Sequence, residues 1–101
     1  MSTETTISLD ARYVRDESVV ARLIGQEFLL VPTRGNVAEM DHIFVLNPVA
    51  ARIWELLDGK RTIAEIGALI CDEFDVDLAS VGRDVVEFLD KLLSVGIARR
   101  V

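Results

Sequence analysis

The sequence offers few side chains that could catalyse a reaction or bind a metal ion. Its single histidine is His42 and its single cysteine is Cys71, and neither has an obvious catalytic partner beside it. The chain has no glycine-rich phosphate loop and no ligand cluster with the spacing of a metal site. Its many carboxylates are those expected of a solvated surface. We therefore predict a protein that is not an enzyme and that uses no cofactor or metal.

The acidic residues are unevenly distributed along the chain. The sequence has 17 Asp and Glu against 11 Lys and Arg, a formal net charge of −6. Residues 72–90 hold seven acidic residues and one basic residue, a local net charge of −6, whereas the remaining residues hold ten of each. Phosphate backbones require cations, so this distribution argues against a nucleic-acid partner.

Length and composition indicate one small soluble domain. With 101 residues, half of them hydrophobic, the chain is long enough to bury a core without disulfides, and one cysteine cannot form an internal disulfide. The polar first residues do not have the pattern of a signal peptide, and no apolar run approaches the roughly 18 residues of a membrane span. The sequence predicts a cytoplasmic protein with no membrane partner.

Short apolar runs in the first half of the chain predict three strands. Residues 1–17 are expected to form a loosely ordered N-terminal arm, with some order near Tyr13 and Val14, and the domain proper is expected over 18–101. Residues 19–24 and 27–31 flank Gly25-Gln26, which is typical of a hairpin. After a polar loop over 33–41, residues 42–46 predict a third strand that is apolar on both faces.

The second half of the chain has the spacing of three helices. Asn47 and Pro48 fit the cap and first position of a helix that ends before Gly59. Thr62 and Glu65 have the spacing of a capping box for a second helix that reaches Phe74 and that places Cys71 in the core. A third helix is expected from 77–80 to Ser94, just before Gly96. The predicted fold class is α+β: a three-stranded antiparallel sheet followed by a three-helix bundle, in a winged-helix-like arrangement.

The apolar arc of the third predicted helix is wider than one packing partner needs. At about 100° per residue the arc spans about 160°, whereas about 100° is usual. One explanation is a helix wedged between the sheet and the other helices. The other is that part of this arc lines a groove beside the third strand, where an extended peptide could pair with the strand edge. A winged-helix DNA-binding domain and a structural or dimerisation module that uses the same edge are the alternatives.

Nearly the whole chain, residues 10–98, resembles the PqqD-like family. The residues that carry the resemblance are Phe44 to Asn47, Ala50, Ile53 to Gly59, Arg61 to Ile63, Glu65-Ile66, Phe74 to Val76, Asp84-Val85, Phe88-Leu89, Leu92-Leu93 and Gly96-Ile97. It is strongest between Leu46 and Ile66, where most of these residues are of the kind that forms the core, caps and turns. It departs from the family pattern at Pro48-Val49, where many members have a glycine-containing pair, and in a longer loop before the third strand. These departures favour a relative of the quinone-pathway protein that serves another peptide.

The resemblance implies a RiPP recognition element, a small bacterial domain that binds the leader of a ribosomally made precursor peptide. Such a domain presents the leader to a modifying enzyme, which is a radical-SAM protein in pyrroloquinoline quinone biosynthesis. The resemblance also implies that the leader pairs with the third strand and packs on the third helix. The corresponding residues of this chain are Ile43, Phe44, Val45 and Leu46 on the strand, and Arg83, Asp84, Glu87, Phe88 and Lys91 on the helix. The expected assembly state is a monomer or a weak homodimer.

Overall fold

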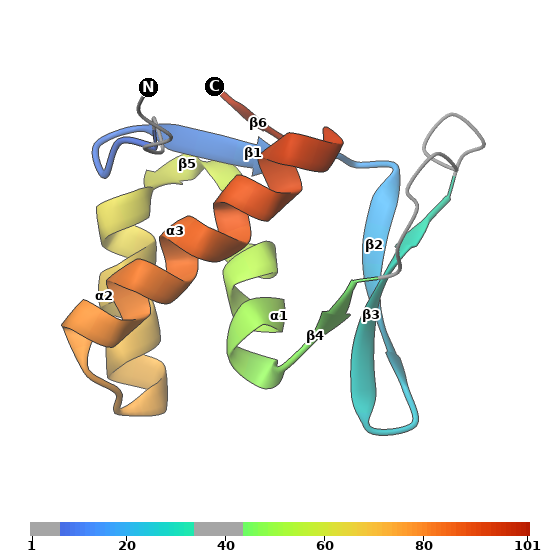
Figure 1. Cartoon of the computed structure of the whole chain (residues 1–101), viewed down its shortest axis with the longest axis horizontal. Helices are drawn as coiled ribbons and strands as arrows, with labels where there is room; N and C mark the ends of the chain where they lie inside the picture. The colour runs from blue at the N-terminus through green and yellow to red at the C-terminus, as the bar shows by residue number, and fades with distance from the viewer. Residues whose placement is uncertain (1–6, 34–43) are drawn as a thin grey trace, which may run out of the picture.

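Three helices pack against two small antiparallel sheets, one at their side and one across their end, in the computed structural model, which describes residues 7–33 and 44–101 (Figure 1). One sheet contains a hairpin of β2 (Val19–Ile24) and β3 (Glu27–Pro32), to which β4 (Val45–Leu46) adds in the order β2-β3-β4. Gly25 closes the hairpin with a φ of 66°, a left-handed conformation that glycine adopts without strain. The predicted three-stranded antiparallel sheet is confirmed. The described part of its third strand is shorter than predicted, and His42 and Ile43 lie outside the described residues.

The three predicted helices are all present. They are α1 (Pro48–Leu56), α2 (Ile63–Phe74) and α3 (Leu78–Val95). Asn47 caps α1 by accepting a hydrogen bond from the Ala50 amide, and Thr62 and Glu65 form the predicted capping box of α2. Gly96 ends α3 with a φ of 80°. None of the helices in the described part of the chain is long and apolar enough to cross a membrane.

A second sheet, which the sequence did not predict, covers one end of the helices. It contains β1 (Arg12–Arg15), β5 (Asp58–Thr62) and β6 (Ala98–Arg100), in the order β5-β1-β6. Within the arm expected over 1–17, the order expected near Tyr13 and Val14 extends over residues 11–15, because Ala11 and Tyr13 are buried and β1 is the central strand. Residues 1–6 lie outside the described part. Gly59 does not end α1 but lies in β5, with a φ of 79°.

Buried residues from all three helices and both sheets form one core. Ile53, Ile66 and Leu89 are almost completely buried, as the helical periodicity predicted. Cys71 is half-buried and packs against this core, close to the predicted core position. The core fixes α1 and α3 relative to β4, and these three elements surround the site described next.

Candidate functional site

The edge of β4 leaves backbone groups free to pair with another strand. The amide of Leu30 donates to the carbonyl of Phe44, and Leu29 lies opposite Val45 in the antiparallel register. Because hydrogen-bonded and non-hydrogen-bonded positions alternate along such a pair, the N–H and C=O of Val45 point away from β3. Val45 is 58% exposed, whereas Leu46 is buried. Within the described part of the chain, β4 is thus an edge strand with an outward-facing donor and acceptor.

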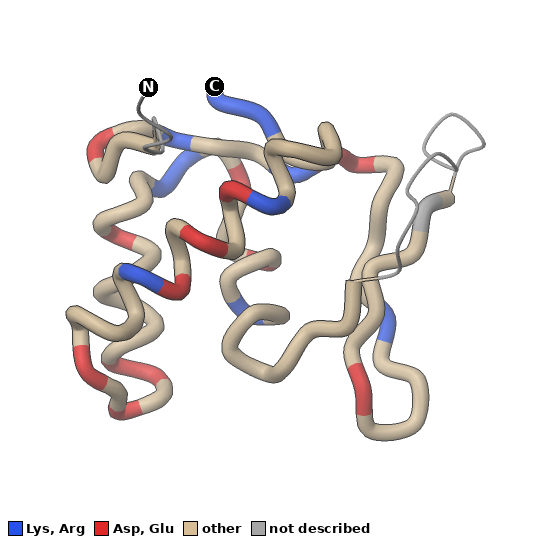
Figure 2. Tube along the Cα trace, viewed as in Figure 1, with Lys and Arg blue, Asp and Glu red and all other residues tan. Residues whose placement is uncertain are grey.

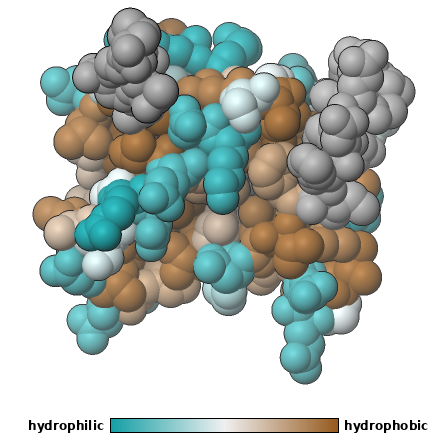
Figure 3. Space-filling view, viewed as in Figure 1, coloured by the Kyte–Doolittle hydropathy of each residue, from teal (hydrophilic) through white to brown (hydrophobic). Residues whose placement is uncertain are grey.

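A groove of about 350 Å³ begins where β4 ends and runs between α1 and α3. Ile53 and Val81 are buried and Phe88 is half-buried, so the floor of the groove is apolar. Its rim is polar. Figure 3 shows a band of hydrophilic side chains along α3, with hydrophobic side chains on either side of the band. A groove with an apolar floor and a charged rim can accept a peptide with both hydrophobic and charged side chains.

Four of the five predicted residues of the third helix line this groove. They are Asp84, Glu87, Phe88 and Lys91, and Ser80 and Val81 extend the same lining toward the start of the helix. At about 100° per residue, these six positions fall within an arc of about 120° of the helix. Asp84, Glu87 and Lys91 are exposed and Phe88 is half-buried. The charged side chains thus form the rim, and Phe88 lies closer to the floor.

Arg83, the fifth predicted residue, lies in a different place. It lines a second hollow of about 450 Å³ between α2 and α3, where its neighbours include Gly67, Leu78 and Gly82. Arg83 does not line the groove beside β4. Arg83 thus lies one helical turn before Glu87, on the side of α3 that lines the second hollow.

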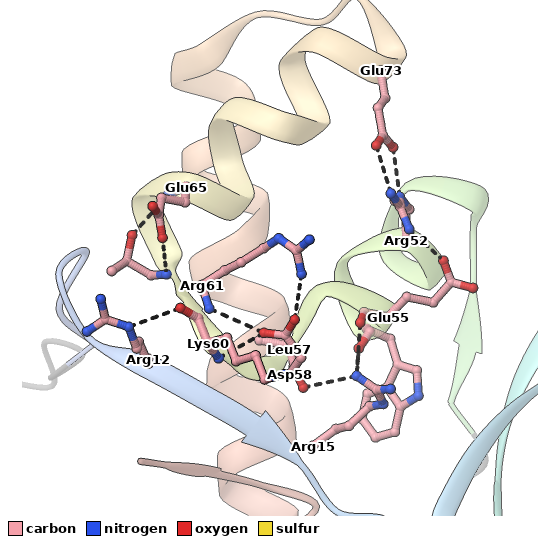
Figure 4. A network of polar contacts seen from close by, with 12 residues as sticks. Arg12, Arg15, Arg52, Glu55, Leu57, Asp58, Lys60, Arg61, Glu65 and Glu73 are labelled. Atoms are coloured by element: carbon pink, nitrogen blue, oxygen red, sulfur yellow. Dashed lines mark hydrogen bonds and ion pairs between the residues drawn. The ribbon is translucent and has the colours of Figure 1, made fainter.

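Hydrogen bonds to carbonyls hold the end of α1 in place (Figure 4). The guanidinium of Arg15 in β1 donates to the carbonyls of Trp54, Glu55 and Leu57 at distances of 3.3, 2.9 and 3.0 Å. Carbonyls at the end of a helix lack partners within the helix, so one arginine satisfies several of them. The unpredicted strand β1 thus positions one wall of the groove.

An ion pair between Arg52 and Glu73 joins α1 to α2 (Figure 4). Arg52 Nε and Nη2 donate to the two carboxylate oxygens of Glu73 at 2.8 and 2.9 Å, and Nη1 donates to Glu55 at 3.1 Å. The hydrogen bonds from Arg52 lower the pKa of Glu73. Such a bidentate pair is geometrically specific, so it fixes the angle between the helices more than it adds stability.

The structure divides the acidic residues of 72–90 into groups with different surroundings. Glu73 pairs with Arg52, and Asp77 caps α3 by accepting from the Ser80 amide. Asp84 and Glu87 instead stand at the groove, and Figure 2 shows acidic positions at the turn between α2 and α3 and along α3. Duplex DNA at this groove would bring phosphates against these carboxylates, which is unfavourable.

Sequence reasoning missed the wall of the groove that α1 provides. This wall consists of Asn47, Val49, Ala50 and Ile53. Val76, in the turn before α3, also lines the groove. One signal could have identified this wall: a single residue, Asn47, separates β4 from α1. With so short a connection, the first turn of α1 must lie at the end of the edge strand.

Comparison with solved structures identifies the fold. The chain is similar to the protein in the structure titled "TbiB1 in Complex with the TbiA(beta) Leader Peptide", with a TM-score of 0.63 and 30% sequence identity. The match covers 84% of this chain and 93% of TbiB1. The antiparallel three-stranded sheets and the three helices are thus those of the RiPP recognition element fold.

Sequence comparisons identify the family. The family model described as coenzyme PQQ synthesis protein D (PqqD) matches residues 27–98, and the chain belongs to this family. It is 40% identical over 67 residues to proteins named "PqqA binding protein" from Xanthomonas euvesicatoria pv. vesicatoria (strain 85-10) and Xanthomonas axonopodis pv. citri (strain 306). Each match covers 66% of this chain and spans 64% of the relative's length.

Proposed function

We propose that this protein is a non-catalytic adaptor that binds the leader of a ribosomally synthesised precursor peptide as an added strand. The observation that carries the proposal is the outward-facing N–H and C=O of Val45 on an edge strand, next to the groove between α1 and α3. An extended peptide pairs with such an edge through its main chain and gains specificity from its side chains.

The edge and the groove contribute different parts of the binding free energy. Of the predicted edge residues Ile43, Phe44, Val45 and Leu46, Ile43 lies outside the described part of the chain. Val45 is the one among the other three whose N–H and C=O face away from β3. Alternate side chains of an added strand point to opposite faces, so every second leader residue faces α3. Hydrophobic leader residues pack over Ile53, Val81 and Phe88, while Asp84, Glu87 and Lys91 contact charged or polar ones.

The similar proteins support this proposal, because their names and titles refer to peptide binding. The two Xanthomonas proteins are named for PqqA binding, and TbiB1 was solved with a leader peptide. We infer that the peptide of this protein belongs to the same broad class of ribosomally made precursors. The departures at Pro48-Val49 and in the loop before β4 favour a precursor other than that of the quinone pathway.

The adaptor acts on its peptide by holding it for another protein. In this proposal a modifying enzyme of the radical-SAM type, or a similar one, modifies the part of the precursor beyond the bound leader. The protein works in the cytoplasm as a monomer or weak homodimer. Assaying the candidate enzyme encoded beside its gene, with full-length precursor and with or without this protein, tests that role. Equal rates with and without the protein would refute it.

Titration of the isotope-labelled protein tests leader binding directly. The probes are the leader of the precursor encoded beside its gene, a Xanthomonas PqqA peptide and the TbiA(beta) leader, each with a scrambled peptide of the same composition as control. We expect amide shifts at Val45 to Asn47 and along the groove-lining face of α3, with one of the three probes giving the strongest response. Shifts confined to other surfaces, or none with any probe, would refute the proposal.

A further inference from the structure

We propose that the groove selects leaders in which a basic residue is followed, two residues later, by an acidic residue. This inference rests on the proposed function and adds to it the charge pattern and the direction of the bound peptide. Glu87 and Lys91, both on the groove-lining face of α3, carry the inference.

The charges along the groove have a fixed order. Asp84 and Glu87 come first along α3 and Lys91 follows, so the rim is acidic toward the start of the helix and basic toward its end. Within residues 7–33 and 44–101, no ion pair or side-chain hydrogen bond engages these three side chains. All three are exposed, which leaves them available to a ligand. This distinguishes them from Glu73 and Asp77, whose carboxylates are already engaged within the fold.

The spacing of these charges matches an extended peptide. Residues four apart in a helix are separated by about 6 Å along its axis, which is the separation of Glu87 and Lys91. Side chains on one face of a strand recur every two residues, at about 6.7 Å. A basic residue facing Glu87 therefore places the leader residue two positions away opposite Lys91. A spacing of three would point one of the two side chains away from the helix.

The direction of β4 sets the order of the two charges in the leader. In Figure 1 the chain enters β4 near the hairpin and runs toward the start of α1, and α3 runs in the opposite sense across this face. The sheet is antiparallel throughout, and an antiparallel pairing is slightly more stable per residue than a parallel one. A leader added antiparallel to β4 runs in the same sense as α3. It meets Asp84 and Glu87 first and Lys91 later, so its basic residue precedes its acidic one.

A walk of charge pairs along the leader tests this inference. The probe is whichever of the three leaders gives the strongest response in the titration above, with Lys-x-Glu, Glu-x-Lys or Gln-x-Gln placed at successive positions. Each exposed ion pair contributes about half of 1 kcal/mol, so the two pairs together change the affinity about 5-fold. At one position we therefore expect the leader with Lys-x-Glu to bind about 5-fold more tightly than the one with Gln-x-Gln, and the leader with Glu-x-Lys to bind about 5-fold more weakly. The difference should shrink at high salt. Two orders that bind alike at every position, or a preference for Glu-x-Lys, would overturn the inference.

Exchanging the two charges of the protein provides a second test. The double variant Glu87→Lys with Lys91→Glu should invert the preference, so that Glu-x-Lys binds more tightly than Lys-x-Glu. Asp90→Lys is the matched control, because Asp90 is exposed on the same helix but does not line the groove. This control makes the same charge reversal as Glu87→Lys and should keep the wild-type preference. An unchanged preference in the double variant would refute the assignment.

The outcomes separate this inference from the proposed function. If the unmodified leader and the other two probes leave the amides of Val45 and α3 unshifted, the proposed function fails. If the unmodified leader shifts them but charge order has no effect on its affinity, only the inference about charge fails.

Discussion

Replacing Val45 with proline tests whether the edge of β4 pairs with the leader. Val45→Pro removes the N–H that points away from β3. It leaves the pairing of Phe44 and Leu46 with β3 in place, because those residues face β3. Proline is tolerated in edge strands where its position faces outward, and Val45 is 58% exposed. We therefore expect the free energy of unfolding to change by no more than about 1 kcal/mol.

The effect on binding should be much larger than the effect on folding. The bound leader would lose one main-chain hydrogen bond and would keep a buried, unpaired carbonyl, which costs about 1–3 kcal/mol. At 1.4 kcal/mol per factor of ten, the Kd should rise about 5- to 150-fold. Val45→Thr is the matched control, since it keeps both the N–H and the branched shape of the side chain and should bind within about 2-fold of the wild type.

Isothermal titration calorimetry measures these affinities, with the leader that shifts the amides of the isotope-labelled protein. Thermal unfolding of each variant verifies that it is folded. A folded Val45→Pro variant that binds with the affinity of the wild type would refute the pairing at this residue. Weak binding by Val45→Thr would also contradict the argument, because it would assign the effect to the side chain.

Four further predictions follow from the same structure. Gly82→Ala should raise the free energy of unfolding by about 0.5–1 kcal/mol in urea denaturation, because Gly82 lies within a helix and a Cβ there meets nothing within 4 Å; a destabilised variant would contradict this. Gly59→Ala should lower the free energy of unfolding by about 1–2 kcal/mol, because the left-handed backbone is unfavourable for alanine and the new Cβ would lie 3.3 Å from Val101. An unchanged free energy of unfolding would contradict this and would show that the strand relaxes freely. Arg83→Glu should leave leader affinity within about 2-fold in the same calorimetric assay, despite its reversal of charge, because Arg83 lines the other hollow. The hydrogen bond from the Thr62 amide lowers the pKa of Glu65 below 4.5. The ionised Glu65 carboxylate therefore contributes its full stabilisation above pH 4.5, and this contribution is lost as the pH falls through the lowered pKa. The Glu65→Gln variant should lose less stability than the wild type between about pH 7 and pH 3.

Local patterns predicted the helices and the hairpin well, because their signals lie close together in the sequence. Asn47-Pro48, the Thr62–Glu65 box and Gly96 act within a few residues of the boundary that they set. The hairpin is likewise specified by Gly25-Gln26 between two apolar runs. Each signal satisfies or constrains backbone groups next to it, so one sequence is sufficient to recognise it.

The second sheet could not be predicted in this way, because its partners are far apart in the sequence. β5 has the sequence Asp-Gly-Lys-Arg-Thr, which has no apolar alternation and is typical of a turn. It forms a strand because β1 pairs with it from more than 40 residues away, with Arg12 opposite Thr62. The helix residues of the candidate site were expected from the family resemblance. Asp84, Glu87, Phe88 and Lys91 do line one groove, but only the packing of α2 against α3 shows that Arg83 lines the other hollow.

Hydrogen exchange at the Val45 amide tests leader binding at the β4 edge most directly. In the free protein this N–H points away from β3 and should exchange quickly, whereas the Leu46 N–H faces β3. Adding the leader should slow exchange at Val45 strongly and change that at Leu46 much less. If exchange at Val45 stays fast while the leader is bound, the leader does not pair with β4 and the proposed mode of binding is wrong.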